Sequence, residues 1–222
     1  MPAGESFDSL GWKPSPTDTG VPQPGSDFWP GEFSRTHVGV ARHGYLEVMD
    51  ALRRGRVWVD HGHLVDALDV RVVAEGDRGP GVTLGGRLAA ARGERIEPRI
   101  TVRTASRPNP KGVLPQLGHL DVIRGAVTGA VADRDSWRAP DTKVVERIDT
   151  SGRRGTFELR LPLGRAAEPF YLRLRGSDGR RQGTGYLGAA IDPAGPIPHP
   201  DNEGDPWADT WLYTNPVFVD VR

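Results

Sequence analysis

The sequence predicts a mainly β protein: an antiparallel β-sandwich of immunoglobulin-like shape, preceded by an irregular segment and one amphipathic helix. Two observations support this class. Short segments in which apolar and polar residues alternate recur after residue 55, with glycine- or proline-containing turns between them. Apolar residues at helical spacing occur just ahead of those segments. We therefore expect two regions, a Pro-rich segment with the helix in 1–55 and the sandwich in 56–222.

The first region begins without a periodic pattern. Pro14, Pro16, Pro22, Pro24 and Pro30 recur through it, and proline supplies no backbone hydrogen-bond donor. The segment therefore predicts irregular chain that does not form a domain of its own.

One helix is expected from Gly44 to Arg54, ended by Gly55. Its apolar residues recur every three or four positions and so form one stripe; they are Tyr45, Val48, Met49 and Leu52. Such a stripe predicts that one side of the helix packs against another surface.

Strands are expected where β-branched, aromatic or alternating apolar residues follow the helix. The expected strand segments are 57–59, 67–74, 96–104, 119–124, 143–148, 156–163, 170–175 and 217–221. The segments 156–163 and 170–175 alternate most clearly and are separated only by turn residues, so we expect them to pair in one sheet. Pro216 cannot donate to a central ladder, which predicts a bulge, strand start or edge before Val217.

Composition limits the classes of function. The chain of 222 residues carries 29 basic and 29 acidic residues, so its charge indicates neither a nucleic acid nor a membrane as partner. The absence of cysteine excludes disulfides, thiolate catalysis and zinc–sulfur sites. No apolar run reaches the roughly 18 residues of a membrane span, and the N-terminus lacks the order of a signal peptide. A cytoplasmic location is the default expectation.

Two side-chain groups indicate a metal. His61 and His63 lie two residues apart, with Asp60 and Asp66 near enough to complete a site. A polar turn at the end of a strand explains the same residues. A second group, in segment 201–205, has the spacing of a calcium loop without its remaining ligands, and a solvated loop is the alternative.

Tryptophans in the expected loops indicate a ligand site. Trp137, Trp207 and Trp211 occur there, near the carboxylates of Asp135 and Asp192, and such pairs can stack on and hydrogen-bond a sugar. Tryptophans that cover the sandwich core are the alternative. The motifs of serine hydrolases, P-loop proteins and zincins do not occur in the sequence.

The segment GSDFWPGEFSRTHV, the helix and strand that follow it, and the closing YTNPVFV resemble the final part of bacterial PHP-domain metallohydrolases of the CehA/McbA-like kind. The resemblance implies a distorted (β/α) barrel with a histidine-rich centre of divalent metal (Zn, Mn or Fe). Such centres hydrolyse phosphoesters or related bonds, and a β-sandwich-like extension often follows the barrel.

The match to the family's last metal motif, Ser-Asp-x-His, is partial. Ser26 and Asp27 fit it, but Trp29 occupies the histidine position. The resemblance therefore implies one metal ligand, Asp27, and the chain has no counterpart of the family's H-x-H motif. His37 stands where the family has an aromatic residue, which predicts a role in packing or in loop structure rather than as a metal ligand.

The resemblance implies the C-terminal accessory part of a PHP-type phosphoesterase, inactive as an isolated chain and without a bound cofactor of its own. Its expected partner is a missing or separate catalytic barrel, and an uncovered helix face would allow self-association. A stand-alone β-sandwich module that binds a carbohydrate or a protein is the alternative. A small metalloenzyme centred on His61 and His63 is a third hypothesis.

Overall fold

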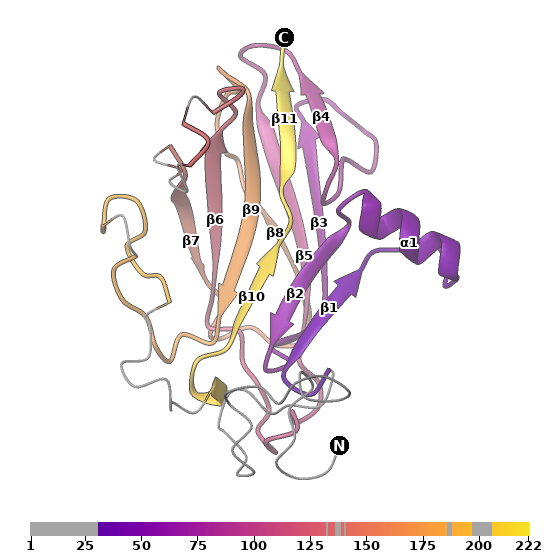
Figure 1. Cartoon of the computed structure of the whole chain (residues 1–222), viewed down its shortest axis with the longest axis vertical. Helices are drawn as coiled ribbons and strands as arrows, with labels where there is room; N and C mark the ends of the chain where they lie inside the picture. Colours follow the sequence, from indigo (N-terminus) through magenta and orange to yellow (C-terminus); the bar gives the residue numbers. More distant parts are fainter. Residues whose placement is uncertain (1–30, 132, 136–138, 140, 186–187, 197–205) are drawn as a thin grey trace.

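Two β-sheets face each other across one apolar core (Figure 1). The computed structural model describes residues 31–131, 133–135, 139, 141–185, 188–196 and 206–222. In this part of the chain, the smaller sheet has the order β3 (Val65–Ala74), β5 (Ile96–Thr104) and β8 (Thr156–Arg160). The larger sheet contains β1 (Ser34–Val38), β2 (Val57–His61), β4 (Arg87–Ala90), β6 (His119–Ala126), β7 (Lys143–Asp149), β9 (Phe170–Ser177), β10 (Trp211–Thr214) and β11 (Val217–Val221). The predicted mainly β class, a sandwich with one helix, is confirmed.

The core lies between the sheets, where alternate residues of each strand point inward. Ile100 and Val102 of β5 are fully buried from one side, and Leu120, Val122 and Leu212 are fully buried from the other. Burying each such side chain stabilises the fold by about 1.5–3 kcal/mol relative to exposure. These residues are the ones that the alternating patterns predict.

The strand β9 is central to the larger sheet. It pairs with β6 on one edge and with both β10 and β11 on the other. The segment between β10 and β11 contains Pro216, which has no N–H to donate, and β11 begins directly after it at Val217. The predicted strand start after Pro216 is confirmed. All strand pairs in the described residues are antiparallel except β4 with β11.

The predicted pairing of 156–163 with 170–175 is wrong. The first segment forms β8, which pairs with β5 in the smaller sheet, and the second forms β9 in the larger sheet. The chain from Gly164 to Pro169 therefore crosses from one sheet to the other. Alternation of apolar and polar residues identifies a strand with one buried face. It does not indicate which sheet the strand joins, because both sheets of a sandwich have an apolar inner face.

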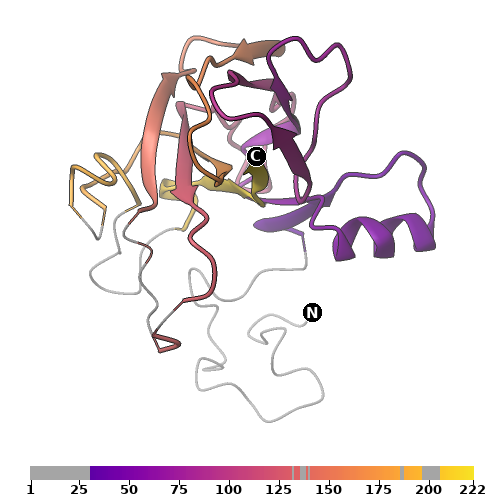
Figure 2. The same cartoon turned by 90° about the horizontal axis from the view of Figure 1, so that it is seen from above.

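Part of the region expected to be irregular belongs to the sheet. Ser34–Val38 forms β1, which pairs with β2 along five residues on each strand. The helix α1 (Tyr45–Arg53) connects these two strands and stands to one side of the sheets (Figure 2). Among the described residues, no helix combines the length and the apolar character needed to cross a membrane.

The helix is present as predicted, but its apolar stripe does not pack as expected. Only Ala51 is buried, whereas Tyr45 is 77% exposed and Leu52 is 42% exposed. Leu46, outside the predicted stripe, is 75% exposed. Val48 and Met49, at the centre of the stripe, are half-buried, so the described part of the chain covers this stripe only in part.

Two glycines fix the position where α1 returns to the sheet. Gly55 follows the helix with a φ of +67°, and Gly85 approaches it with a φ of +75°. A Cβ atom on Gly85 would overlap the carbonyl oxygen of Arg54. The side chain of Asn215 donates a hydrogen bond of 3.1 Å to the Gly55 carbonyl. Only glycine allows this close approach of two backbones.

Candidate functional site

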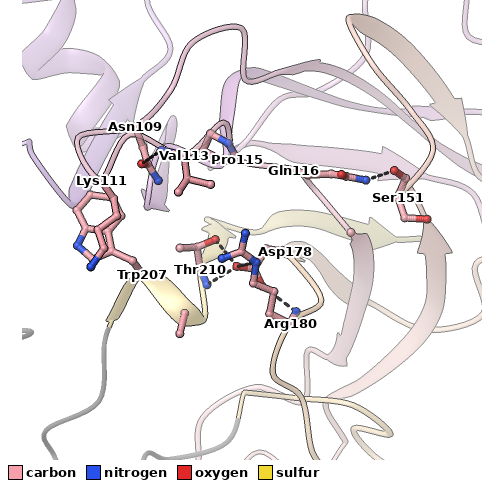
Figure 3. A pocket seen from close by; sticks show the side chains of 12 residues that line it. Asn109, Lys111, Val113, Pro115, Gln116, Ser151, Asp178, Arg180, Trp207 and Thr210 are labelled. Carbon is pink, nitrogen blue, oxygen red and sulfur yellow. Dashed lines mark hydrogen bonds and ion pairs between the residues drawn. The ribbon is translucent and has the colours of Figure 1, made fainter.

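A pocket of about 380 Å³ lies at the end of the sandwich where β9 ends and β6 and β10 begin (Figure 3). Its lining residues come from three segments, 109–118, 178–180 and 207–210, together with Ser151. In Figure 3, Asn109 and Val113 lie on one side of the pocket, while Asp178 and Thr210 lie opposite. The pocket therefore combines loops that are far apart in the sequence.

A carboxylate is fixed in one wall of this pocket. Oδ2 of Asp178 accepts hydrogen bonds from the backbone N–H and the hydroxyl of Thr210, at 3.1 and 2.9 Å. Oδ1 accepts one from the backbone N–H of Arg180 at 2.9 Å. The Asp178 side chain is only 7% exposed, and the Arg180 Nε atom lies 4.0 Å from its Oδ2. These bonds hold the carboxylate in one orientation.

The opposite wall contains an amide that is held in the same way. Asn109 is 8% exposed. Its Nδ2 donates to the Gly62 carbonyl at 3.3 Å, and its Oδ1 accepts from the Val113 N–H at 3.2 Å. The neighbouring Gln116 is positioned too, because its amide donates to the Ser151 carbonyl and accepts from Arg154. The polar groups of the pocket are thus oriented before any ligand arrives.

The structure separates the three predicted tryptophans. Trp207 lies in the short helix η2 (Pro206–Ala208), lines the pocket and makes an edge contact with Phe33 at 5.1 Å between ring centroids. Trp211 lies in β10, is only 4% exposed and does not line the pocket. Its indole N–H donates to Asp209 at 2.6 Å. Trp137 falls outside the described residues.

Burial dominates the electrostatics beside Trp211. It raises the pKa of the Asp209 carboxyl, and the hydrogen bond from Trp211 opposes this only in part. The ring of Trp211 also lies under the Arg175 guanidinium, with 5.3 Å between the Arg175 Cζ atom and the ring centroid. Trp211 therefore packs between charged groups on the outer face of the sheet, which differs from both predicted roles, a sugar platform and a core cover.

A buried charge cluster occupies that outer face. Asp121 of β6 is 1% exposed and accepts hydrogen bonds from Arg175 of β9, which also binds Asp192. Burial raises the pKa of Asp121, but the nearby His119 ring, 3.6 Å away, and the hydrogen bonds and charge of Arg175 outweigh it, so this pKa lies below its ordinary value. Burial lowers the pKa of Arg175, but the bonds to Asp192 and Asp121 outweigh it and raise this pKa. Through the bond between Arg175 and Asp192, the cluster holds the loop that follows β9 against the sheet.

The two histidines of the metal hypothesis have separate partners. His61 shares a hydrogen bond of 2.8 Å with the Ser34 hydroxyl, and the Nε2–H of His63 donates one of 3.1 Å to the Gly31 carbonyl. Gly62 and His63 have φ values of +74° and +59°, so the strand ends at His61 and a polar turn follows, as the alternative interpretation predicted. Burial lowers the pKa of His61, with Asp60 opposing it, which favours the neutral imidazole.

Asp60, the strand residue before His61, is fully buried. It accepts hydrogen bonds of 2.8 Å from Arg35 and from the Leu64 N–H, so its charge has a structural role. His37 stacks on Trp58 with 3.7 Å between ring centroids, which is the packing role expected at this position. No three His, Asp or Glu side chains within the described ranges form a group suited to a metal ion. Asp27 and the segment 201–205 lie outside those ranges.

Comparison of the chain with family models, with curated proteins and with solved structures found no match. The resemblance to PHP-domain metallohydrolases therefore stays a prediction. Of the three predicted tryptophans, Trp207 lines this pocket, and its role in binding a ligand stays a prediction. The sequence analysis did not single out Asn109 or Asp178. Neither belongs to a recognisable motif, since their importance comes from burial and from partners in other loops.

Proposed function

We propose that this chain is the accessory β-sandwich of a PHP-type metal-dependent phosphoesterase and that it contacts a catalytic barrel through α1. The observation that carries the proposal is the exposure of apolar side chains on that helix. Tyr45 and Leu46 are 77% and 75% exposed. Adjacent exposed apolar residues of this size are typical of an interaction surface.

The neighbouring strand extends this surface. In the described part of the chain, β1 pairs only with β2, so its other edge presents backbone groups that can pair with a second protein. Val48 and Met49 are half-buried on the same helix. Exposed apolar side chains on α1, beside the unpaired edge of β1, suit a large, folded partner better than a small molecule.

In this arrangement, the barrel and not the sandwich would hydrolyse the phosphoester. A hydrolytic metal centre needs several converging ligands to hold the ion and to lower the pKa of bound water. The resemblance supplies only Asp27 for this purpose. We therefore expect the chain to stabilise the barrel or to shape access to it, without catalysing hydrolysis alone.

Two measurements test the proposal. The purified chain, supplied with Zn²⁺, Mn²⁺ or Fe²⁺, should bind less than one equivalent of metal and should not hydrolyse bis(p-nitrophenyl) phosphate. It should form a complex with a CehA/McbA-like barrel in analytical ultracentrifugation. The double variant Tyr45→Ser, Leu46→Ser should lose that complex, whereas Val131→Ser, at another exposed apolar residue, should keep it.

Three outcomes would count against the proposal. Hydrolysis by the chain alone with one bound metal ion would make it an enzyme. A complex that survives the double variant would place the contact elsewhere. A dimer of the isolated chain that the double variant abolishes would assign the α1 surface to a second copy.

A further inference from the structure

We propose that the pocket between Asn109 and Asp178 binds a neutral sugar, meaning a pyranose ring that carries hydroxyl groups and no charge. This inference is independent of the phosphoesterase proposal, because the pocket shares no lining residue with α1. It follows from the unused hydrogen-bonding positions around the pocket, from the apolar side chains among them, and from the opposite charges of Asp178 and Arg180.

Two side chains in one wall of the pocket retain acceptor positions. An ionised carboxylate offers about four such positions, and in the described part of the chain Thr210 and Arg180 fill three of those of Asp178. The Thr210 hydroxyl donates its hydrogen to Asp178, so its own lone pairs can accept from another donor. The same bonds fix both groups in place. This wall can therefore accept hydrogen bonds from the hydroxyls of a ligand.

Two amides around the rest of the pocket retain donors, since an amide nitrogen carries two N–H groups. Asn109 uses one N–H for the Gly62 carbonyl. Gln116 uses one for the Ser151 carbonyl. Within the described ranges, the second N–H of each amide has no acceptor, and Figure 3 shows the Asn109 side chain pointing into the pocket. Because a hydroxyl both donates and accepts, neighbouring hydroxyls of a sugar complement this combination of acceptors and donors.

Apolar side chains lie among these polar groups. Val113, Pro115 and Ala208 line the same pocket. A pyranose has C–H groups on the faces of its ring and hydroxyls at its rim, so it can contact both kinds of surface. The volume of about 380 Å³ lies near the lower end of the ~300–1000 Å³ typical of ligand pockets, so a small ligand fits best. Orientation of the polar groups in advance reduces the entropy cost of binding.

Opposite charges in the pocket favour a ligand without charge. The Asp178 carboxylate would repel an anion, and the Arg180 guanidinium would repel a cation. The Nε atom of Arg180 lies 4.0 Å from Oδ2 of Asp178, so these two charges balance each other. Lys111 also lines the pocket, but it is engaged in an interaction of its own and is not a free cation for a ligand.

Isothermal titration calorimetry of the purified chain with glucose, galactose and mannose tests the inference. At least one of these hexoses should show saturable binding at millimolar concentration. The uronate and the 2-amino derivative of that hexose should each bind more weakly, by about threefold or more. The reason is that the uronate meets the carboxylate of Asp178 and the amino sugar meets the guanidinium of Arg180.

Two variants test the position of the bound sugar. Val113→Trp fills the pocket with a larger side chain and should abolish measurable binding, and the fold should tolerate it because Val113 is 41% exposed. Asn109→Asp replaces the amide donor by an acceptor and should weaken binding by about tenfold. The matched control is Val131→Trp, at a valine that is 59% exposed and does not line the pocket. This control should leave the affinity unchanged.

The thermal melting temperature of each variant shows whether it is folded, so that loss of binding in a folded protein can be recognised. Absence of saturable binding of all three hexoses would overturn the inference. Equal or tighter binding of the charged derivatives would also overturn it, because the ligand would then not be selected for neutrality. Binding that persists in Val113→Trp would place the sugar outside this pocket and would equally refute the proposal.

Discussion

Arg175 and Asp121 face each other on the paired strands β9 and β6, and the Arg175 side chain donates hydrogen bonds of 3.0 and 2.8 Å to Asp121 Oδ2. The same guanidinium donates two bonds of 2.7 Å to Asp192 in the loop that follows β9. One buried cation therefore joins two strands and the loop that covers them. Arg147 of β7 adds a hydrogen bond of 3.0 Å to the Ala194 carbonyl, so two arginines hold this loop against the sheet.

Substitution of Arg175 by Met should destabilise the protein by about 3–5 kcal/mol, because it leaves the buried charge of Asp121 without its main partner. Urea unfolding followed by circular dichroism measures the change. The matched control is Arg160→Met, which breaks the exposed ion pair with Glu158 and should cost no more than about 1 kcal/mol. Equal effects of the two substitutions would show that burial of Arg175 adds nothing to stability.

The free energy of unfolding should fall as the pH drops below about 6.5, with His61 contributing to the slope. Burial lowers the pKa of folded His61, so the unfolded chain takes up a proton at a higher pH than the folded protein. His61→Gln should flatten the slope between pH 7 and 5. The exposed His43 provides the control, since His43→Gln should preserve it. An unchanged slope in His61→Gln would contradict the assignment.

Gly85→Ala should destabilise the protein more than Gly93→Ala. Both glycines have positive φ, +75° and +84°, so both substitutions carry similar backbone strain. Only at Gly85 does the new methyl group meet backbone, at the Arg54 carbonyl, whereas nothing lies within 4 Å at Gly93. We expect an additional cost of about 1–3 kcal/mol at Gly85. Thermal unfolding of both variants measures it, and equal costs would refute the close contact.

The sequence was sufficient for the helix and most of the strands, but not for the partners with which they pack. Alternation in 156–160 and 170–177 is a local property, and it predicted β8 and β9 without indicating that they lie in different sheets. The spacing of Tyr45 and Leu52 likewise predicted α1, but not that these two residues of its stripe are exposed. The strand β1 escaped prediction because pairing with β2 stabilises it, rather than an apolar pattern of its own.

The candidate pocket was predictable only through Trp207. Asp178 and Thr210 are 32 positions apart, and their hydrogen bonds exist only because β9 and β10 pair. Arg175 and Asp121, 54 positions apart, occupy positions that alternation assigns to the solvent side of their strands. The loop that contains Asp192 covers that side and buries them. Burial by a distant loop is a tertiary property that no local pattern encodes.

The position of β11 has a practical consequence for handling this protein. Although β11 is formed by residues 217–221, it lies between β9 and β4 rather than at a border of the sheet. Deletion of residues 217–221 would remove the strand that pairs with β4 and would uncover Leu172, the β9 residue that pairs with Val217. A protein fused directly after β11 should therefore be joined through a long spacer, so that its bulk does not hinder the insertion of this strand between β9 and β4.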